Sequence, residues 1–309
     1  MGTVVTADHY LAGMIGLGLL RTWYLDGHVN AERMRELTET LQRSDEFPFS
    51  MVLDPTERDL QAGYEEWAPS YDGPNPMIET EERVAHPILR DLAGPGLDAL
   101  DAACGTGRQA SLLHSLGCTT VGVDRSEAMI TVAREKLPAV RFEIGDVEHL
   151  PFGDESFDLA VVSLALCHLS DPGDAVIELA RVLRPGGTLV ITDPHPFGGM
   201  LGGQAFYGGI APDRPMTWVR NNYHSASTWL RSFRSAGLTV EECIEEPFSD
   251  EQIASSPADL VFPAAARAAM TGLASVWVWA VPVFRIVLLF SVLCRLSVVR
   301  SALWLLPAG

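Results

Sequence analysis

The chain has 309 residues, of which 47% are hydrophobic, enough to bury the core of a large domain and leave room for further segments. Its formal net charge of −18, from 40 acidic and 22 basic side chains, makes nucleic acid a poor expected partner, because binding phosphates requires Lys and Arg. The five cysteines form no C-x-x-C pair. This pattern favours reduced thiols in the cytoplasm over a disulfide scaffold or a metal site.

Two helices joined by a turn are predicted near the N-terminus. Residues 8–42 show helical spacing of apolar residues on both sides of an expected turn at Asp26–Gly27. The apolar run LAGMIGLGLL follows no basic segment and contains three glycines, so a signal peptide is not expected. We take residues 1–58 as an N-terminal helical segment.

A further helix is predicted in the stretch RDLQAGYEEWAPSYDGPNPM. Its aromatic residues Tyr64, Trp67 and Tyr71 lie three and four positions apart, which is the spacing of one helical face. We expect these rings to pack on the core. This stretch begins the main domain, which we place at residues 59–281.

Helices and short apolar strands alternate from Ile78 onward. The segments LDALDAA, CTTVGVD, VRFEIGD, FDLAVVS and GTLVITD are predicted strands, and most of them are separated by helical segments that Gly and Pro end. Strands that alternate with helices in this way form a parallel sheet covered on both faces. The sequence therefore predicts a doubly wound α/β fold.

The turn DAACGTGRQA after the first of these strands predicts a nucleotide-bearing ligand. Gly105, Gly107 and Ala110 have the spacing of a dinucleotide turn, and Asp124 ends the next strand, where a carboxylate accepts hydrogen bonds from ribose hydroxyls. Asp101 stands just before the glycines. A fixed negative charge there disfavours the pyrophosphate of a nicotinamide cofactor and suits a ligand with an ammonium or sulfonium group.

These residues resemble the class I S-adenosylmethionine-dependent methyltransferases. DAACGTG, VGVDRSEAM, RFEIGDVEHLPFGDESFDLAVVS and LARVLRPGGTLVITDPH follow one another in the order of that family's motifs. The resemblance covers most of residues 60–250 and is greatest to small-molecule and quinone-biosynthesis C-methyltransferases. It also implies a final hairpin from GLTVEECIEE and LASVWVWAV, and thus a seven-stranded, mostly parallel sheet.

The resemblance implies S-adenosyl-L-methionine as cofactor and assigns its contacts. Asp101, Gly105 and Gly107 would surround the methionine portion, with Ser163 on the same side. Asp124 would bind the ribose, Asp146 would accept from the adenine amino group, and Val147 would offer its backbone there. Tyr71 resembles a lid aromatic. Asp146 alternatively holds the Gly145 turn, and Ser163 alternatively is a buried hydroxyl bonded to backbone.

Two histidines are the candidate general bases. His195 follows the fifth predicted strand, where the acceptor should enter, and His224 begins the helix after a Gly- and aromatic-rich stretch. That stretch, at about residues 194–224, is expected to cover an apolar or aromatic methyl acceptor. We expect His168 to have a packing role.

Residues 282–309 form an apolar extension that departs from the family pattern and carries Arg285, Arg295 and Arg300. Two roles are open for it: an interfacial helix on a membrane or a dimer contact. We expect the whole chain to be a cytoplasmic methyltransferase, with either peripheral membrane contact or dimerisation through this extension. The alternatives are a cofactor-binding regulatory protein without turnover and a nicotinamide-dependent oxidoreductase.

Overall fold

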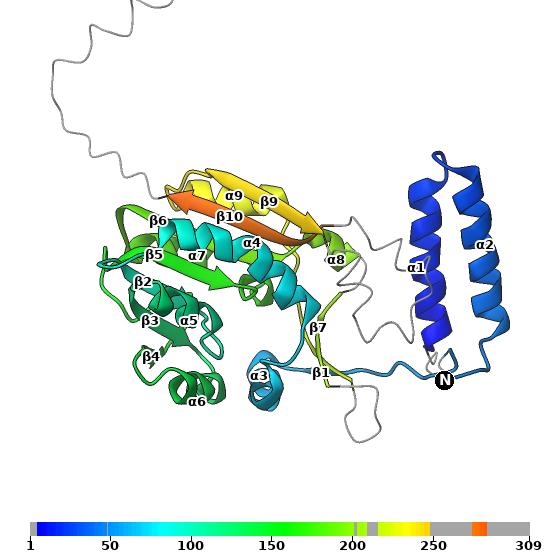
Figure 1. Ribbon diagram of the computed structural model, residues 1–309, viewed down its shortest axis with the longest axis horizontal. Coiled ribbons are helices and arrows are strands. Elements are labelled where there is room, and N and C mark those ends of the chain that lie inside the picture. The colour runs from blue at the N-terminus through cyan, green and yellow to red at the C-terminus, as the bar shows by residue number, and fades with distance from the viewer. Residues whose placement is uncertain (1–4, 48, 201–202, 209–215, 248–273, 283–309) are drawn as a thin grey trace, which may run out of the picture.

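The computed structural model describes residues 5–47, 49–200, 203–208, 216–247 and 274–282. A seven-stranded sheet forms the centre of the main domain, in the order β4-β3-β2-β5-β6-β10-β9 (Figure 1). Its strands are β2 (Asp98–Ala102), β3 (Thr119–Asp124), β4 (Arg141–Ile144), β5 (Phe157–Ser163), β6 (Leu183–Pro194), β9 (Glu242–Pro247) and β10 (Ala274–Pro282). β10 runs antiparallel to both of its neighbours, while β2 to β6 pair in parallel.

The prediction of a doubly wound, seven-stranded and mostly parallel sheet is confirmed. The order reverses at β2, from which β3 and β4 extend to one side and β5 and β6 to the other. In such sheets, ligands bind beyond the carboxyl ends of the strands at the reversal point. The predicted final hairpin is also present, as β9 and β10.

Alternate strand residues serve the two faces of the sheet, as the pleat of a β-strand requires. Leu100, Val162 and Ile191 pack in the cluster that contains Leu179 and Trp229, from α7 (Gly173–Val182) and α9 (Ala226–Ser235). Ala99, Val161 and Val190 pack on the other face. Their cluster includes Leu89 and Leu113, from α4 (Pro76–Leu92) and α5 (Arg108–Ser115). Layers of helix on both faces bury the sheet.

The helix α6 (Glu127–Lys136) completes the edge near β4. Its residues Ile130 and Ala133 pack on Phe142 of β4 and Ala110 of α5. Ser126 caps this helix by accepting a hydrogen bond from the Met129 amide. This cap fixes the loop that follows β3, next to Asp124.

The N-terminal helices α1 (Ala7–Thr22) and α2 (Gly27–Gln42) form a hairpin beside the main domain (Figure 1). Asp26 ends the turn between them and caps α2 by accepting from the His28 and Val29 amides. The hairpin has a small cluster of its own, built on Met14 and Ile15. The two helices and the turn between them were predicted from the sequence.

A second, three-stranded sheet joins distant parts of the chain. β1 (Thr56–Arg58) pairs in parallel with β8 (Thr217–Val219), and β8 pairs antiparallel with β7 (Ala205–Tyr207). β1, at the end of the predicted N-terminal segment, thus pairs with a strand of the predicted main domain, and the boundary at residue 58 stays a prediction. The stretch at 194–224 contains α8 (Pro196–Met200) and two strands, so its described part has regular structure of its own.

The helix α3 (Leu60–Trp67) lies against this small sheet, and the short turn η1 (Ala68–Ser70) follows it. Close packing requires Gly63, since a Cβ at this position would collide with the side chain of Val219. Among the helices in the described part of the chain, none is both long and apolar enough to cross a membrane. The predicted extension at 282–309 lies outside the described residues, except for Pro282 at the end of β10.

Candidate cofactor and acceptor cavities

The first cavity lies beyond the carboxyl ends of β2, β3, β4 and β5. The turns after these strands supply Gly105, Asp124, Asp146, Val147 and Ser163 to its lining. Tyr71, which follows η1, also lines this cavity and lies next to Gly105. The structure thus brings together six of the eight residues that the sequence analysis assigned to the cofactor.

Asp124 connects the two loops that shape the first cavity. One carboxylate oxygen accepts from the Gly105 amide at 2.8 Å, and the other accepts from the Ser126 amide at 2.8 Å. Burial raises the pKa of Asp124, while these amides oppose the shift. The carboxylate lines the cavity and has lone pairs left to accept from ligand hydroxyls.

Asp101 and Gly107 lie behind the lining of this cavity. The Asp101 side chain is 1% exposed and accepts from the Ala110 amide of α5 at 2.7 Å. Gly107 has a φ of +80°, and a Cβ there would come within 3.1 Å of Phe142 and 3.2 Å of Leu137. The structure shows a supporting role for both residues: Asp101 ties β2 to the first turn of α5, and Gly107 lets the turn pack on Phe142 and Leu137. Their expected contact with the methionine portion stays a prediction.

Burial raises the pKa of Asp101 to about 7. The Ala110 hydrogen bond and the nearby Arg108 favour the charged form but do not offset the loss of water. The negative charge that sequence reasoning placed at the ligand is thus shielded by protein.

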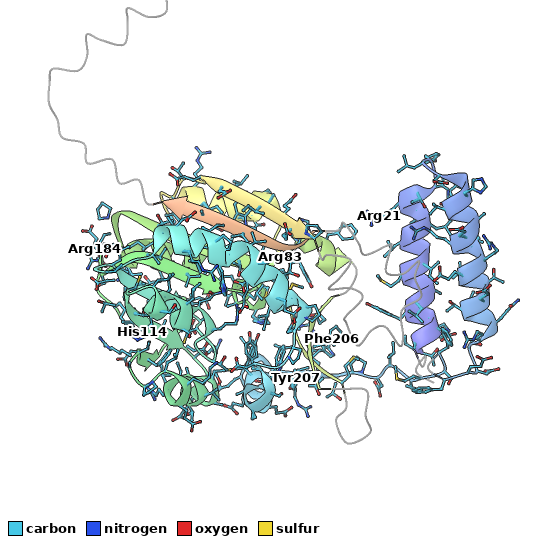
Figure 2. The ribbon with its side chains drawn as sticks, viewed as in Figure 1. Arg21, Arg83, His114, Arg184, Phe206 and Tyr207 are labelled. Atoms are coloured by element: carbon cyan, nitrogen blue, oxygen red, sulfur yellow. The ribbon has the colours of Figure 1, made fainter. Side chains whose placement is uncertain are left out.

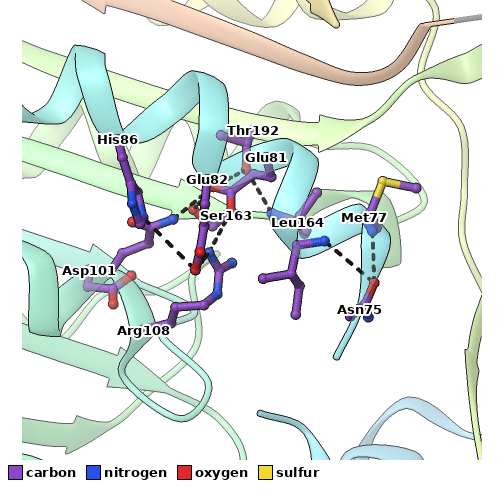
Figure 3. Close-up of polar contacts among 12 residues, drawn as sticks. Asn75, Met77, Glu81, Glu82, His86, Asp101, Arg108, Ser163, Leu164 and Thr192 are labelled. Carbon is purple, nitrogen blue, oxygen red and sulfur yellow. Dashed lines mark hydrogen bonds and ion pairs between the residues drawn. The ribbon is translucent and has the colours of Figure 1, made fainter. Parts of the chain in front are cut away.

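A buried carboxylate from α4, Glu81, contacts Ser163 in the lining of the first cavity (Figure 3). Glu81 is fully buried and accepts from Gln109 at 2.8 Å, Ser163 at 3.0 Å and Thr192 at 3.2 Å. It also pairs with Arg108 at 2.5 Å. Glu81 therefore orients the Ser163 hydroxyl by accepting its hydrogen bond, and Glu81 was not identified from the sequence.

The turn after β4 presents Asp146 and Val147 side by side on the cavity wall. Asp146 accepts from the Glu148 amide at 3.0 Å, so it also holds its own turn, as the alternative for this residue predicted. Gly145 packs tightly, because a Cβ there would come within 2.9 Å of Val123 and 3.0 Å of Pro151. Both roles of Asp146 are compatible, since one oxygen remains for a ligand.

A second cavity of about 210 Å³ adjoins the first. Its lining is aromatic, aliphatic or neutral polar, and includes Trp67, Asn75, Gln204, Phe206 and Asn221. The small sheet supplies Phe206 from β7, which lies near α3 (Figure 2). Trp67 stacks on Tyr207 with ring centroids 5.0 Å apart. The stack joins α3 to β7 at the wall of this cavity.

The two cavities share four lining residues: Tyr64, Tyr71, Leu164 and His168. Tyr64, Trp67 and Tyr71 thus face the cavities, whereas the sequence analysis expected packing on the core. The rings contact one another, with centroids 5.7 Å apart for Tyr64 and Trp67 and 5.1 Å apart for Trp67 and Tyr71. The helical spacing was correct, but it could not indicate which surface the helix would face.

The two predicted bases, His195 and His224, are absent from the lining of both cavities. His195 contacts Glu245 at 3.1 Å and accepts from the Phe197 amide. His224 is 5% exposed, and its Nε2 donates to the Leu166 carbonyl at 3.1 Å. Both histidines thus have protein partners, and their role as general bases stays a prediction.

His168, rather than His195 or His224, is the histidine that lines the two cavities. Its Nε2 lies 2.6 Å from the Tyr64 hydroxyl. Its Nδ1 lies 2.8 Å from the Arg220 carbonyl. The position of His168 directly after a strand end was visible in the sequence, but its partner lies 104 residues away.

Comparison with known proteins agrees with this architecture. Residues 100–191 match the family model described as a methyltransferase domain. A demethylmenaquinone methyltransferase of Renibacterium salmoninarum is 34% identical over 148 residues, or 47% of this chain and 62% of the relative. Methyltransferase GfsG of Streptomyces halstedii is 32% identical over 167 residues, or 52% of this chain and 58% of the relative. The chain thus covers less than two thirds of either relative.

Solved structures show the same fold. An S-adenosylmethionine-dependent methyltransferase from Mesorhizobium loti aligns with a TM-score of 0.50 and 23% identity, over 66% of this chain and 97% of that one. A structure titled as the [4+2]-cyclase SpnF aligns with a TM-score of 0.52 and 18% identity, over 74% of this chain and 98% of that one. The α/β domain has the fold of class I S-adenosylmethionine-dependent methyltransferases, and its residues 100–191 match a methyltransferase domain. S-adenosylmethionine is the cofactor of these methyltransferases.

The first cavity has the donor set that this cofactor needs. Asp124 and Asp146 line it with carboxylates, which are acceptors suited to hydroxyls and amines, and Val147 lies beside Asp146. Tyr64 and Tyr71 present aromatic rings, whose faces attract cations such as a sulfonium group. The residues therefore fit S-adenosylmethionine, and they leave the second cavity for a methyl acceptor.

Proposed function

We propose that this protein transfers a methyl group from S-adenosylmethionine to an O, N or C nucleophile of a small, apolar or aromatic molecule. One observation carries the proposal: the cavity built from the strand-end turns adjoins an aromatic cavity, and the two share Tyr64, Tyr71, Leu164 and His168. A reaction between two bound molecules needs such a junction. Holding both reactants at near-attack distance supplies about 7–11 kcal/mol of the barrier.

In this proposal, the first cavity holds the cofactor through Tyr71, Gly105, Asp124, Asp146, Val147 and Ser163. Asp124 accepts from the ribose, and Asp146 and Val147 meet the adenine. Asp101 and Gly107 shape the turn from behind. Bound S-adenosylmethionine supplies an electrophilic methyl group, and the protein aligns it with the acceptor. The proposal gives His195 and His224 no proton transfer.

The second cavity favours a neutral acceptor. Its lining among the described residues includes no Asp, Glu, Lys or Arg. Burying a charged molecule without a counter-charge is costly, whereas aromatic side chains stack on flat apolar ligands. Asn75, Gln204 and Asn221 supply neutral hydrogen-bonding groups that can orient such a molecule.

The proposed location is the cytoplasm, which the thiols support. Cys104, Cys118, Cys167 and Cys243 are all free, and the first three are buried. A reducing compartment keeps such thiols unpaired. Contact with a membrane or a second copy through residues 282–309 stays a prediction, which flotation with anionic vesicles and sedimentation of the full chain would test.

Two measurements test the proposed function. Calorimetry should give an affinity for S-adenosylmethionine or its demethylated product in the micromolar range, about −8 kcal/mol. Incubation of cell extract with the protein and methyl-labelled S-adenosylmethionine should then yield a labelled small molecule that is absent when the protein is boiled. Absence of cofactor binding would refute the proposal.

A regulatory protein that binds the cofactor without turnover is the second candidate. The SpnF structure, a [4+2]-cyclase by name, shows that this fold also occurs in a protein named for a reaction other than methyl transfer. The fold alone therefore does not fix the reaction. Tight cofactor binding with no labelled product in any extract would support this second candidate.

A further inference from the structure

The contacts of His168 fix its tautomer. The Arg220 carbonyl is only an acceptor, so Nδ1, at 2.8 Å, must carry the proton and donate it. Burial lowers the pKa of His168, which keeps the ring neutral at neutral pH. Nε2 therefore has a free lone pair, and the Tyr64 hydroxyl, 2.6 Å away, donates to it.

The Tyr64 hydroxyl is thereby oriented as an acceptor. Its proton points at Nε2, so the lone pairs of the oxygen are available to another donor. Both Tyr64 and His168 line both cavities. A group bound in the second cavity and facing the first therefore meets an oxygen that is ready to take a proton.

We propose that Tyr64 and His168 form a proton relay that activates a neutral hydroxyl acceptor, so that the product is a methyl ether. This proposal rests on the proposed function and names the acceptor class for the same site. A phenol or an enol fits best, because it gives up a proton more readily than an aliphatic alcohol does and can pass that proton to the Tyr64 oxygen during methyl transfer. An amine would attack through its own lone pair and would need no such relay.

The proposed step balances in atoms and charge. As the acceptor oxygen bonds to the methyl carbon, the bond from that carbon to the cofactor sulfur breaks and its electron pair stays on sulfur. The acceptor proton moves to the Tyr64 oxygen, and the Tyr64 proton moves to Nε2 of His168. One positive charge leaves the sulfonium and one appears on the imidazolium, whose Nδ1–H remains bonded to the Arg220 carbonyl.

The other groups around the pair keep it from ionising early. Tyr64 contacts Tyr71, with ring centroids 6.1 Å apart. Burial raises the pKa of Tyr64 well above its ordinary value, and the nearby Tyr71 and Asp124 add to this shift. Cys167, whose amide donates to the buried Asp193, has a thiol pKa that burial also raises.

On the His168 side of the pair, the Arg220 side chain pairs with Glu57, so the charge of Arg220 is partly neutralised. Tyr64 thus passes a proton on as a neutral phenol.

The first test is substitution within the relay. Tyr64→Phe keeps the ring and removes the hydroxyl, and His168→Gln removes the basic nitrogen. We expect each to lower kcat at least about 10²-fold while the cofactor Kd stays within about twofold. Tyr24→Phe and His114→Gln, at positions remote from both cavities, are the matched controls and should leave kcat unchanged.

A second readout does not depend on turnover. Nitrogen NMR of protein with labelled histidine should show His168 with a protonated Nδ1, an unprotonated Nε2 and a pKa below the ordinary value of about 6.5. The kcat of the wild type should fall as pH drops through that same pKa, because the imidazolium cannot accept a proton. A merely structural hydrogen bond would not tie the kinetic profile to the histidine titration.

The product identifies the acceptor. With 13C-methyl S-adenosylmethionine and cell extract, the chemical shift of the labelled carbon distinguishes methyl on oxygen from methyl on nitrogen or carbon. Methyl on oxygen, together with the loss in both variants, supports the relay. Methyl on nitrogen or carbon, or a Tyr64→Phe variant with wild-type kcat, overturns the relay and leaves the methyltransferase proposal intact. No labelled product overturns the proposed transfer itself and the relay with it.

Discussion

The walls of the two cavities are built in different ways. The first cavity takes Gly105, Asp124, Asp146 and Ser163 from turns that each follow one strand of the same parallel sheet. The second takes its walls from α3 and β7, which are held together by a small sheet joining residues 56–58 to 217–219. The strand-end wall of the first cavity therefore depends mainly on residues close together in the sequence, whereas the second cavity depends on pairing between segments far apart in the sequence.

Sequence reasoning succeeded where structure is local. Glycines at turns, acids at strand ends and the alternation of strands with helices depend on neighbouring residues, and each was identified correctly in the first cavity. The seven-stranded fold followed from the ordered motifs. The sequence did not indicate that Asp101 accepts from the Ala110 amide, since a carboxylate before the turn can serve either a ligand or the helix after it.

Sequence reasoning failed where partners are distant. No pattern near Tyr64 indicates that His168 lies 2.6 Å away, and no pattern near Glu81 indicates that it accepts from Ser163 and Thr192. β1 is only three residues long, so it gives no periodic signal. The aromatic face of α3 was recognised, but the surface it meets is set by the pairing of β1 with β8.

The largest expected effect tests whether the first cavity depends on a distant residue, Glu81 of α4, as well as on the turns after the strands. Glu81→Ala should lower the free energy of unfolding by about 3–5 kcal/mol, because Arg108 would keep a buried charge without its main partner. Urea denaturation measures this change. Glu79→Ala, near the start of the same helix and exposed, is the control and should change stability by less than about 1 kcal/mol. Equal effects of the two substitutions would show that the Glu81 network contributes nothing special.

The next effect concerns the turn itself. Gly107→Ala should destabilise the protein by about 2–4 kcal/mol, since a residue with a Cβ is strained at φ +80° and would crowd Phe142 and Leu137. The matched control is Gly13→Ala within α1, where a Cβ meets nothing and should add about 0.5–1 kcal/mol of stability. Thermal unfolding of both variants and the wild type measures these changes in stability. A Gly107→Ala variant as stable as the wild type would mean that the turn adapts freely.

A third effect concerns affinity at the first cavity. Asp124→Ala should weaken binding of S-adenosylmethionine by about 1.5–3 kcal/mol, because charge-assisted hydrogen bonds to the ribose are lost. Calorimetry against the wild type gives the difference. Asp45→Ala, an exposed acid in the connector after α2, controls for the change in net charge. Unchanged affinity in Asp124→Ala would remove this residue from the ribose site.

The smallest expected effect comes from two N-terminal deletions, which distinguish the role of the α1–α2 hairpin from that of β1. Deleting residues 1–54 removes α1 and α2, which pack mainly on each other, and keeps β1. Deleting residues 1–58 also removes β1 and leaves β8 without its parallel partner. We expect both truncated chains to bind S-adenosylmethionine with wild-type affinity, because the first cavity has no lining residue before Leu60.

Turnover should distinguish the two truncations. Without β1, β8 becomes an edge strand that pairs only with β7. Phe206 of β7, on the wall of the second cavity, is then held less firmly. The longer deletion should therefore raise the acceptor KM several-fold more than the shorter one, with an unchanged cofactor Kd. If both deletions impair turnover equally, the hairpin itself forms part of the acceptor site. If neither does, the three-stranded sheet is dispensable, and local structure suffices for the second cavity as it does for the first.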